Sequence, residues 1–248
     1  MAGTAVLGRL TWQIAEVVDA LPETSRVRTI VFDAPDWPGH RAGQHLDVRL
    51  TAEDGYQAQR SYSLASAPDE PPAITVERLD DGEVSPFLVD ELRPGDRLEL
   101  RGPIGGYFVW DGADEPPVLL VGGGSGIVPL MSMLRHRVAS GSSAPVRLLY
   151  SSRTFEDVIY RDELEALGAE AGIDVAQTLT RAQPEGWQGY ARRIDDEILR
   201  EVAFAPGERA AVFVCGSTRF VDTVADGLLR FGYDAAQIRT ERFGATGG

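Results

Sequence analysis

A glycine cluster near the middle of the chain has the residue types and spacing of a phosphate-binding loop. Gly122, Gly123, Gly124 and Gly126 follow the apolar run 118–121 and precede an apolar-periodic segment. This order predicts a buried strand, a tight turn and a helix. Glycines let backbone N–H groups approach a phosphate closely, and the helix start adds the positive end of its dipole. The loop therefore indicates a phosphate-bearing ligand, with a nucleotide as the leading choice.

Three known loop types compete for this stretch, and none matches it fully. A kinase-type P-loop needs Gly-Lys-Ser/Thr, and the chain has no lysine here. A hydrolase nucleophile elbow needs Gly-x-Ser-x-Gly, but Ile127 lies two residues after Ser125. A dinucleotide loop needs Gly-x-Gly-x-x-Gly, and Pro129 takes the last position. A tight turn without a ligand also stays open, although consecutive glycines cost backbone entropy.

Two patterns of elements surround this loop. Before it, short alternating strands at 13–18, 27–32, 45–50, 61–64, 74–79 and 97–101, with a short helix at 86–92, predict a small antiparallel β-barrel. After it, strands at 146–151, 175–179, 210–215 and 238–243 alternate with helices at 157–171, 194–202 and 219–231. The second pattern predicts a doubly wound α/β parallel sheet. We expect a barrel domain over 1–110, a linker over 111–117 and an α/β domain over 118–248.

Polar residues at the predicted strand ends bear on the choice of nucleotide, because ligands of such sheets bind beyond the carboxyl ends of the strands. Ser152 and Arg153 follow the second strand of the α/β part, where an acid favours NAD and an arginine accommodates a 2′-phosphate. Arg161 would add positive charge, and Thr180 and Arg181 form a second polar pair at the same edge. The pattern favours NADP(H), although solvated loop arginines are common.

The predicted barrel carries groups suited to a flat heterocycle and a phosphate. In Arg60-Ser61-Tyr62-Ser63, strand alternation puts the arginine and the tyrosine on one face and the serines on the other. A guanidinium beside an aromatic ring could bind a phosphate and cover a ring system. An ordinary exposed strand face explains the same residues. Ser85 is suited to be the N-cap of the short helix, with or without a phosphate contact.

Composition excludes several classes of protein. The net charge of -14 argues against a nucleic-acid partner, which needs a basic face. The single cysteine, Cys215, excludes an internal disulfide and a four-cysteine iron–sulfur cluster held by one chain. The N-terminal residues lack the features of a signal peptide, and no apolar run reaches the length of a membrane span. We expect a cytoplasmic protein without a metal site.

Taken in order, these motifs resemble those of the ferredoxin–NADP(+) reductase family of flavoproteins, over nearly the whole chain. The motifs are Arg60-Ser-Tyr62-Ser63, Gly82-x-x-Ser85, Gly102-Pro-x-Gly105, Gly122-Gly-Gly124-x-Gly126-Ile-x-Pro129, Cys215-Gly216 and Glu241-Arg-Phe243. Each is weak alone, but six in the family's order make chance a poor explanation.

The resemblance implies FAD on the barrel and NADP(H) on the α/β domain. It implies that Arg60 pairs with the flavin pyrophosphate, that Tyr62 stacks on the isoalloxazine and that Ser63 bonds near flavin N5. Cys215 and Glu241 would lie by the nicotinamide, which makes Ser63, Cys215 and Glu241 the implied catalytic set. The implied cofactor-binding residues are Arg60, Ser61, Tyr62, Ser63, Val76, Arg78, Gly82, Val84, Ser85, Gly123, Gly124, Gly126, Ile127, Pro129, Ser152, Arg153, Arg161, Thr180, Arg181, Cys215, Gly216 and Phe243.

The implied activity is hydride transfer from NADPH to FAD, followed by single-electron transfer to an external acceptor such as ferredoxin or flavodoxin. Such carriers are generally acidic, which conflicts with the net charge of -14. Alternatives are a reductase component of an oxygenase, a free-flavin reductase, and an electron-transfer subunit that binds nucleotide but does not act alone. The sequence fixes neither the acceptor nor the oligomeric state.

The sequence departs from the family's pattern at three points. It has no four-cysteine motif for an iron–sulfur domain. The family's frequent Gly-x-x-Gly-Arg reads Gly189-Tyr-Ala-Arg192-Arg193, so that Arg193 keeps the arginine position and the role of Arg192 is in doubt. The chain also continues from Phe243 to Gly248, so a stacked aromatic as the very last residue is not expected.

Overall fold

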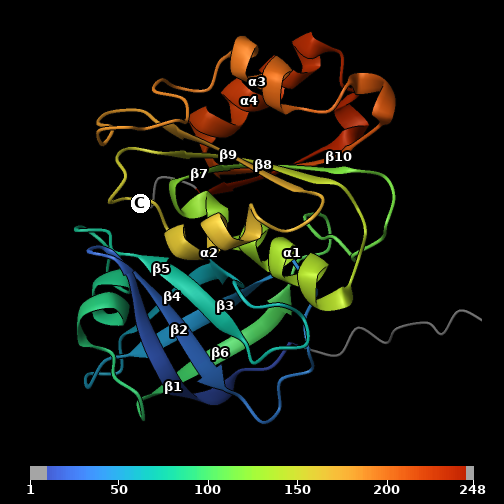
Figure 1. The fold of residues 1–248 in the computed structure, drawn as a ribbon. Helices are drawn as coiled ribbons and strands as arrows, with labels where there is room; N and C mark the ends of the chain where they lie inside the picture. Colours follow the sequence, from blue (N-terminus) through green and yellow to red (C-terminus); the bar gives the residue numbers. More distant parts are fainter. Residues whose placement is uncertain (1–9, 244–248) are drawn as a thin grey trace, which may run out of the picture.

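The computed structural model describes residues 10–243, which form two sheets stacked one above the other with helices between and above them (Figure 1). The expectations for the extreme N-terminus and for residues 244–248 fall outside this range. Among the described residues, no helix combines the length and the apolar character that crossing a membrane requires. The first sheet covers residues 13–104 and the second covers residues 118–243, while the exact domain boundaries stay a prediction.

The first sheet is the predicted antiparallel barrel. Its strands are β1 (Gln13–Thr24), β2 (Val27–Asp33), β3 (His45–Thr51), β4 (Gln57–Ser63), β5 (Ala73–Glu77) and β6 (Arg97–Ile104), in the order β4-β3-β6-β1-β2-β5. The outer strands meet where Leu64 bridges Ile74 and the N–H of Ala65 donates to the carbonyl of Ala73 at 2.7 Å. This contact closes the sheet, and alternate apolar side chains fill its interior.

A short π-type helix, η1 (Phe87–Glu91), packs against β2 and β5 and buries Leu88 and Val89. The prediction of Ser85 as its N-cap was wrong. Pro86 occupies the cap without a side-chain bond, while Ser85 Oγ accepts a hydrogen bond from the N–H of Leu79 at 3.1 Å. Ser85 therefore fixes the preceding turn rather than the helix start.

The second sheet is parallel and doubly wound, as predicted. Its order is β11-β10-β7-β8-β9, and helices α1 and α2 cover the face toward the barrel while α3 and α4 cover the other (Figure 1). The elements are β7 (Val118–Gly123), η2 (Gly124–Gly126), α1 (Ile127–Ser140), β8 (Val146–Ser152), α2 (Arg161–Leu167), β9 (Ile173–Leu179), α3 (Asp196–Val202), η3 (Pro206–Glu208), β10 (Ala211–Ser217), α4 (Thr218–Phe231), η4 (Ala235–Gln237) and β11 (Ile238–Phe243).

Helix α2 is shorter than the predicted 157–171. Val158, Ile159 and Tyr160 are buried in turns before it, and Tyr160 has a φ of 58°, which a right-handed helix cannot contain. The chain turns again directly after Leu167. The apolar residues that looked like one helical face are instead divided between a turn packed into the core and a two-turn helix.

Side chains from α1 tie the two domains together. Ser132 Oγ donates to the carbonyl of Ser66 at 2.6 Å, and Arg135 donates to the carbonyl of Ala65 at 2.8 Å. One buried apolar cluster contains Ala65 and Phe108 together with the inner face of α1. The domains therefore share a core, which holds the ends of the parallel strands in a defined position against the barrel.

Candidate active site

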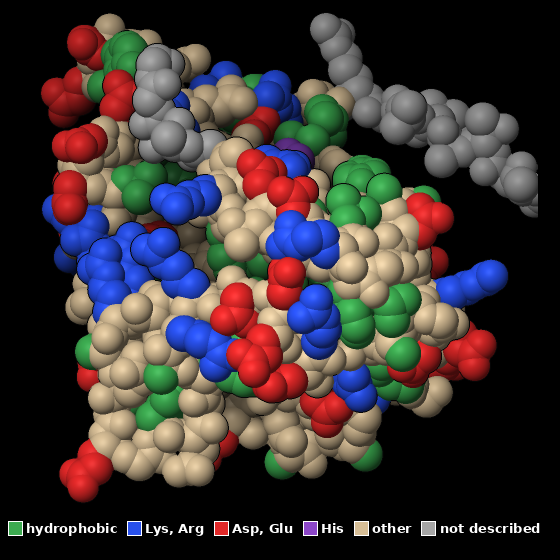
Figure 2. Space-filling view, turned by 90° about the horizontal axis from the view of Figure 1, so that it is seen from above, with side chains coloured by type: hydrophobic (Ala, Val, Ile, Leu, Met, Phe, Trp, Pro, Cys, Tyr) green, Lys and Arg blue, Asp and Glu red, His purple; other side chains and the backbone are tan. Residues whose placement is uncertain are grey.

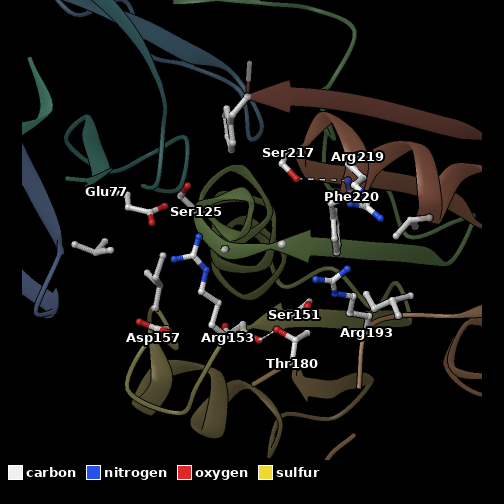
Figure 3. A pocket seen from close by; sticks show the side chains of 18 of the residues that line it. Glu77, Ser125, Ser151, Arg153, Asp157, Thr180, Arg193, Ser217, Arg219 and Phe220 are labelled. Carbon is white, nitrogen blue, oxygen red and sulfur yellow. Dashed lines mark hydrogen bonds between the residues drawn. The ribbon is translucent and has the colours of Figure 1, made fainter. Parts of the chain in front are cut away.

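A cleft of about 600 Å³ lies between the two domains at the carboxyl ends of the parallel strands. Figure 2 shows the molecule from above relative to the view of Figure 1. A hollow lies toward one side of this face, with arginine side chains gathered along it. The α/β domain lines most of the cleft, and the barrel supplies Thr24, Arg26, Val27 and Glu77 (Figure 3). A ligand in this cleft would touch both domains.

The glycine loop forms one wall of the cleft, and three features of its backbone suit it to bind an anion. Gly124 has a φ of 56°, a left-handed conformation that glycine adopts without a steric penalty. A Cβ on Gly126 would lie 2.2 Å from the carbonyl oxygen of Cys215, so the loop can approach β10 only without a side chain. Neither η2 nor α1 has a side-chain cap. Their first N–H groups therefore stay available to an anion, as at other helix starts that bind phosphate.

Four arginines line the cleft, and three of them make it positive because Arg26 is paired with Asp80 at 3.1 Å. Arg153, Arg193 and Arg219 line it, and none has a carboxylate within 4.0 Å among residues 10–243. Ser152 Oγ is buried beside them without a hydrogen-bond partner in the described part of the chain. Asp157 and Glu77 are the acidic residues that also line the cleft. Unpaired arginines and an unsatisfied hydroxyl are suited to the oxygen atoms of phosphate groups.

The structure brings some predicted nucleotide-binding residues into this cleft and leaves others outside. Gly123, Gly124, Ser152, Arg153, Thr180 and Phe243 line it. Arg161 does not, because its guanidinium pairs with Asp162 at 3.2 Å and lies over the ring of Phe155. Arg181 is exposed and also lies outside the lining. Ile127 and Pro129 are buried in the first turn of α1.

The sequence motifs do not point to several of the residues that line the cleft, among them Arg193, Arg219 and Phe220. Arg193 lines the cleft, whereas the preceding Arg192 forms ion pairs with Asp195 at 2.8 Å and Glu197 at 2.7 Å. Arg219 and Phe220 open α4, directly after the small-residue turn that ends β10. That turn was the available signal, because residues that start a helix beyond a parallel strand face the ligand edge of the sheet.

A second constellation lies on the barrel strand β4. Arg60 pairs with Glu83 at 2.9 Å, and the hydroxyl of Tyr56 donates to the same carboxylate at 2.9 Å. Tyr62 packs partly against the barrel core, and burial raises the pKa of its hydroxyl. Ser61 faces the other way and donates to Asp47 at 2.6 Å. Arg60 and Tyr62 thus share one face of β4, as the alternation predicts.

The other predicted barrel residues differ in how their side chains are used. Val76 and Val84 are buried, and Arg78 is held by Asp80 and by Asp90, the latter at 2.7 Å. A Cβ on Gly82 would come within 2.8 Å of Ser85 Oγ, so a larger residue here would displace that side chain. For Val76, Gly82 and Val84, only the backbone remains to contact a ligand.

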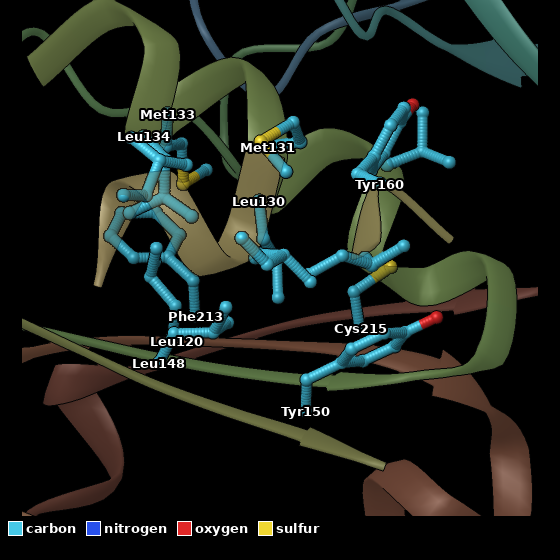
Figure 4. Close-up of a cluster of buried hydrophobic side chains, with 14 of the residues drawn as sticks. Leu120, Leu130, Met131, Met133, Leu134, Leu148, Tyr150, Tyr160, Phe213 and Cys215 are labelled. Carbon is cyan, nitrogen blue, oxygen red and sulfur yellow. The ribbon is translucent and has the colours of Figure 1, made fainter. Parts of the chain in front are cut away.

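The three predicted catalytic residues meet where the barrel adjoins the sheet. Ser63 Oγ donates to Glu241 Oε1 at 3.5 Å. Glu241 lies beside Cys215 in the register of the neighbouring parallel strands β11 and β10. Burial raises the pKa of the Glu241 carboxyl to about 7, and the bond from Ser63 opposes the shift. Cys215 is completely buried (Figure 4), and burial raises the pKa of its thiol, with the nearby Glu241 adding to the effect. The carboxyl of Glu241 can therefore hold or release a proton near neutral pH.

Comparisons with known proteins agree with this geometry. Two family models match, one described as an oxidoreductase FAD-binding domain over residues 17–109 and one as an oxidoreductase NAD-binding domain over residues 120–226. Ferredoxin–NADP reductase B of Sorangium cellulosum (strain So ce56) is 37% identical over 239 residues, which are 92% of this chain and 96% of that protein. The chain has the two domains of an FAD-dependent NAD(P)H oxidoreductase.

Further relatives agree with this class. The ferredoxin reductase component of 3-ketosteroid-9-alpha-monooxygenase from Rhodococcus rhodochrous is 33% identical over 241 residues, which are 95% of this chain and 66% of that protein. The solved ferredoxin NADP+ reductase of Neisseria gonorrhoeae with bound FAD and NADP has the same fold, with a TM-score of 0.81 at 22% identity over 93% of this chain and 98% of that one. This chain belongs to the ferredoxin–NADP(+) reductase family.

The barrel residues fit the FAD that this family uses. Arg60 is partly exposed on β4, next to the ring of Tyr62. Glu241 is a partly buried carboxyl with one side-chain hydrogen bond, at 3.5 Å, within the described residues, so it retains capacity for a ligand donor. A guanidinium, an aromatic ring and a carboxyl at the domain boundary suit the pyrophosphate and the ring system of a flavin dinucleotide.

Proposed function

We propose that this protein oxidises NADPH and passes the electrons singly to an acceptor outside these 248 residues, with ferredoxin or flavodoxin as the leading choice. The observation that carries the proposal is the interdomain cleft, which Arg153, Arg193 and Arg219 line without ion-pair partners among the described residues. A nucleotide with a 2′-phosphate offers these groups one more dianion than NADH does.

In this proposal FAD, when bound, supplies the redox chemistry by accepting a hydride and releasing electrons one at a time. The residues of the chain bind and orient. Arg60 holds the flavin pyrophosphate, and Tyr62 covers the ring system. The glycine loop and the three cleft arginines hold the phosphates of the nucleotide, which fixes the direction in which it enters.

Ser63 and Glu241 handle the proton. The carboxyl of Glu241, with a pKa of about 7, carries a proton on part of the molecules at neutral pH, and because Oε1 accepts from Ser63 that proton lies on Oε2, from which it can be given up. The bond from Ser63 to Oε1 keeps the carboxyl pointed at the barrel. Cys215, completely buried, shapes the pocket and does not act as a thiolate nucleophile.

A separate acceptor is proposed because the chain has one cysteine and cannot hold a four-cysteine cluster by itself. The names of relatives support a ferredoxin as acceptor, since the Sorangium protein is named a ferredoxin–NADP reductase and the Rhodococcus protein a ferredoxin reductase component. A second candidate is the reductase role in an oxygenase system. It is supported by the 32–33% identity to reductase subunits or components of monooxygenases, although the chain spans only about two-thirds of their length.

The test is steady-state oxidation of NADPH and NADH, with ferricyanide as electron acceptor, by the protein as isolated and by Arg153→Ala. We expect a yellow protein that prefers NADPH. Removing the guanidinium should raise KM for NADPH about tenfold to a hundredfold, since hydrogen bonds to charged groups contribute about 1.5–3 kcal/mol. KM for NADH should change by less than about twofold, because NADH has no 2′-phosphate.

Arg200→Ala is the matched control, because Arg200 is an exposed arginine of α3 that does not line the cleft. It should behave as wild type with both nucleotides. A wild-type preference for NADH would retain the reaction and overturn the assignment to NADPH. A protein that oxidises neither nucleotide after FAD reconstitution would be a non-autonomous subunit. Repeating the NADPH assay with ferredoxin, flavodoxin and free FMN then ranks the acceptors.

A further inference from the structure

A chain of hydroxyl groups crosses the domain boundary beside the nucleotide cleft. Tyr160, at the start of α2, donates to Thr75 Oγ1 on β5. The hydroxyls of Thr75 and Thr29 are 2.7 Å apart, and Thr29 donates to Glu23 Oε1 at 2.6 Å. A hydroxyl donates only one hydrogen, so the bonds run in one direction from the tyrosine to the carboxylate. The three hydroxyl residues are buried, each at most 5% exposed.

The residues at both ends of this series of hydrogen bonds, Tyr160 and Glu23, adjoin walls of the cleft. On the α/β side, Tyr160 ends the segment that contains the cleft residues Arg153 and Ile159. On the barrel side, Glu23 precedes Thr24, which also lines the cleft and is the last residue of β1. The hydrogen bonds therefore connect the wall that carries Arg153 to the wall that faces it.

Tyr160 is held firmly in this place. Its φ of 58° is rare for a residue with a bulky side chain and persists only where surrounding contacts enforce it. The guanidinium of Arg135 lies 5.0 Å from the ring centroid and is itself bound by Glu163 at 2.6 and 2.8 Å. Figure 4 shows the hydroxyl of Tyr160 directed away from the parallel sheet. The ring lies in the buried cluster that the two domains share, and its hydroxyl bonds to the barrel strand β5.

We propose that Tyr160 is a positioning residue for NADPH. Its hydrogen bond to Thr75 fixes the segment from Arg153 to Tyr160 against the barrel and so sets the width of the cleft. The guanidinium of Arg153 then lies at the distance from the opposite wall that the 2′-phosphate end of the nucleotide requires. This inference rests on the proposed function and assigns the spacing of that same site to a residue outside it.

Tyr160→Phe is the direct test, because it keeps the ring in the core and removes only the donor. We expect KM for NADPH to rise about fivefold to tenfold, as the loss of a buried hydrogen bond predicts, with kcat within about twofold. KM for NADH should rise less, since NADH has no phosphate for Arg153. The same order should appear in the Kd values of NADP+ and NAD+, measured from perturbation of the flavin absorbance.

Tyr233→Phe is the matched control. Tyr233 is also buried, and its hydroxyl donates to the carbonyl of Phe204 at 2.7 Å within the α/β domain. Both variants lose one buried hydrogen bond and should lower Tm similarly. Only Tyr160→Phe should change the ratio of the KM values for NADPH and NADH, which separates positioning from stability.

Thr75→Val removes the acceptor from the barrel side and should reproduce the kinetic effect of Tyr160→Phe. The double variant should add little to either change, because both break the same bond. A normal KM ratio in Tyr160→Phe together with a lowered Tm would overturn the positioning role and leave the proposed function intact. A wild-type protein that oxidises neither nucleotide would overturn both.

Discussion

Ser63 and Glu241 are 178 residues apart in the sequence, and their side-chain oxygen atoms are 3.5 Å apart at the boundary between the two domains. Ser63 ends a barrel strand, and Glu241 lies on the last strand of the parallel sheet. The contact places a carboxyl with a pKa of about 7 beside the proposed flavin site.

Glu241→Gln should remove a pH dependence of stability. The pKa of Glu241 rises from 4.5 to about 7 in the folded protein, so between these values the unfolded chain loses a proton that the folded one keeps. The stability contributed by this carboxyl is complete below pH 4.5 and is lost as the pH rises through 7. We expect Tm of wild type minus Tm of the variant to fall by about 5–10 °C from pH 5 to pH 8. A constant difference would mean that the carboxyl is ionised throughout.

Glu83→Gln should tighten FAD binding. The carboxylate of Glu83 forms an ion pair with the guanidinium of Arg60 at 2.9 Å, so a flavin pyrophosphate must compete with this carboxylate for the guanidinium. An exposed ion pair contributes about 0.2–1 kcal/mol, which corresponds to a Kd for FAD lowered by up to about fivefold. Quenching of flavin fluorescence on the apoprotein measures this Kd. Glu185→Gln, in an exposed loop, is the control, and weaker binding in Glu83→Gln would show that this carboxylate assists the cofactor.

Gly126→Ala should damage the glycine loop more than Gly124→Ala. The new Cβ at position 126 would lie 2.2 Å from the carbonyl oxygen of Cys215, so β10 or the loop must move. Position 124 has open space, and there only the left-handed φ carries a cost, about 1–2 kcal/mol. We expect Gly126→Ala to have the lower Tm and the higher KM for NADPH. Equal effects of the two substitutions would contradict the close approach of the loop to β10.

Local patterns were enough to predict the architecture. Alternation of apolar residues predicted the six barrel strands, and the run of strand and helix signals after Val118 predicted the parallel sheet. These signals are local because strand and helix periods are read over a few residues. The signal was misleading at residues 157–160, where tertiary packing of Tyr160 in a left-handed conformation overrides a helical pattern.

The site was predictable only in part, because charge partners are a long-range property. Arg153 and Arg161 look alike in the sequence, yet Arg153 lines the cleft and Arg161 pairs with its neighbour Asp162. Likewise, nothing local shows that Glu83 pairs with Arg60 from 23 residues away. The chain of hydroxyls from Tyr160 to Glu23 joins four segments and has no sequence signature.

The two-domain lining of the cleft has a consequence for the cohesion of the whole molecule. A nucleotide that contacts Thr24 and Val27 of the barrel together with Ser125 and Ser217 of the α/β domain binds only while the domains are together. Separation of the domains then has to release the ligand first. By mass action, nucleotide at a hundred times its Kd resists such opening by about 2.7 kcal/mol. In a cell the pool of nicotinamide dinucleotide would thus act as a reversible cross-link, and its depletion would leave the boundary between the domains more open to proteases.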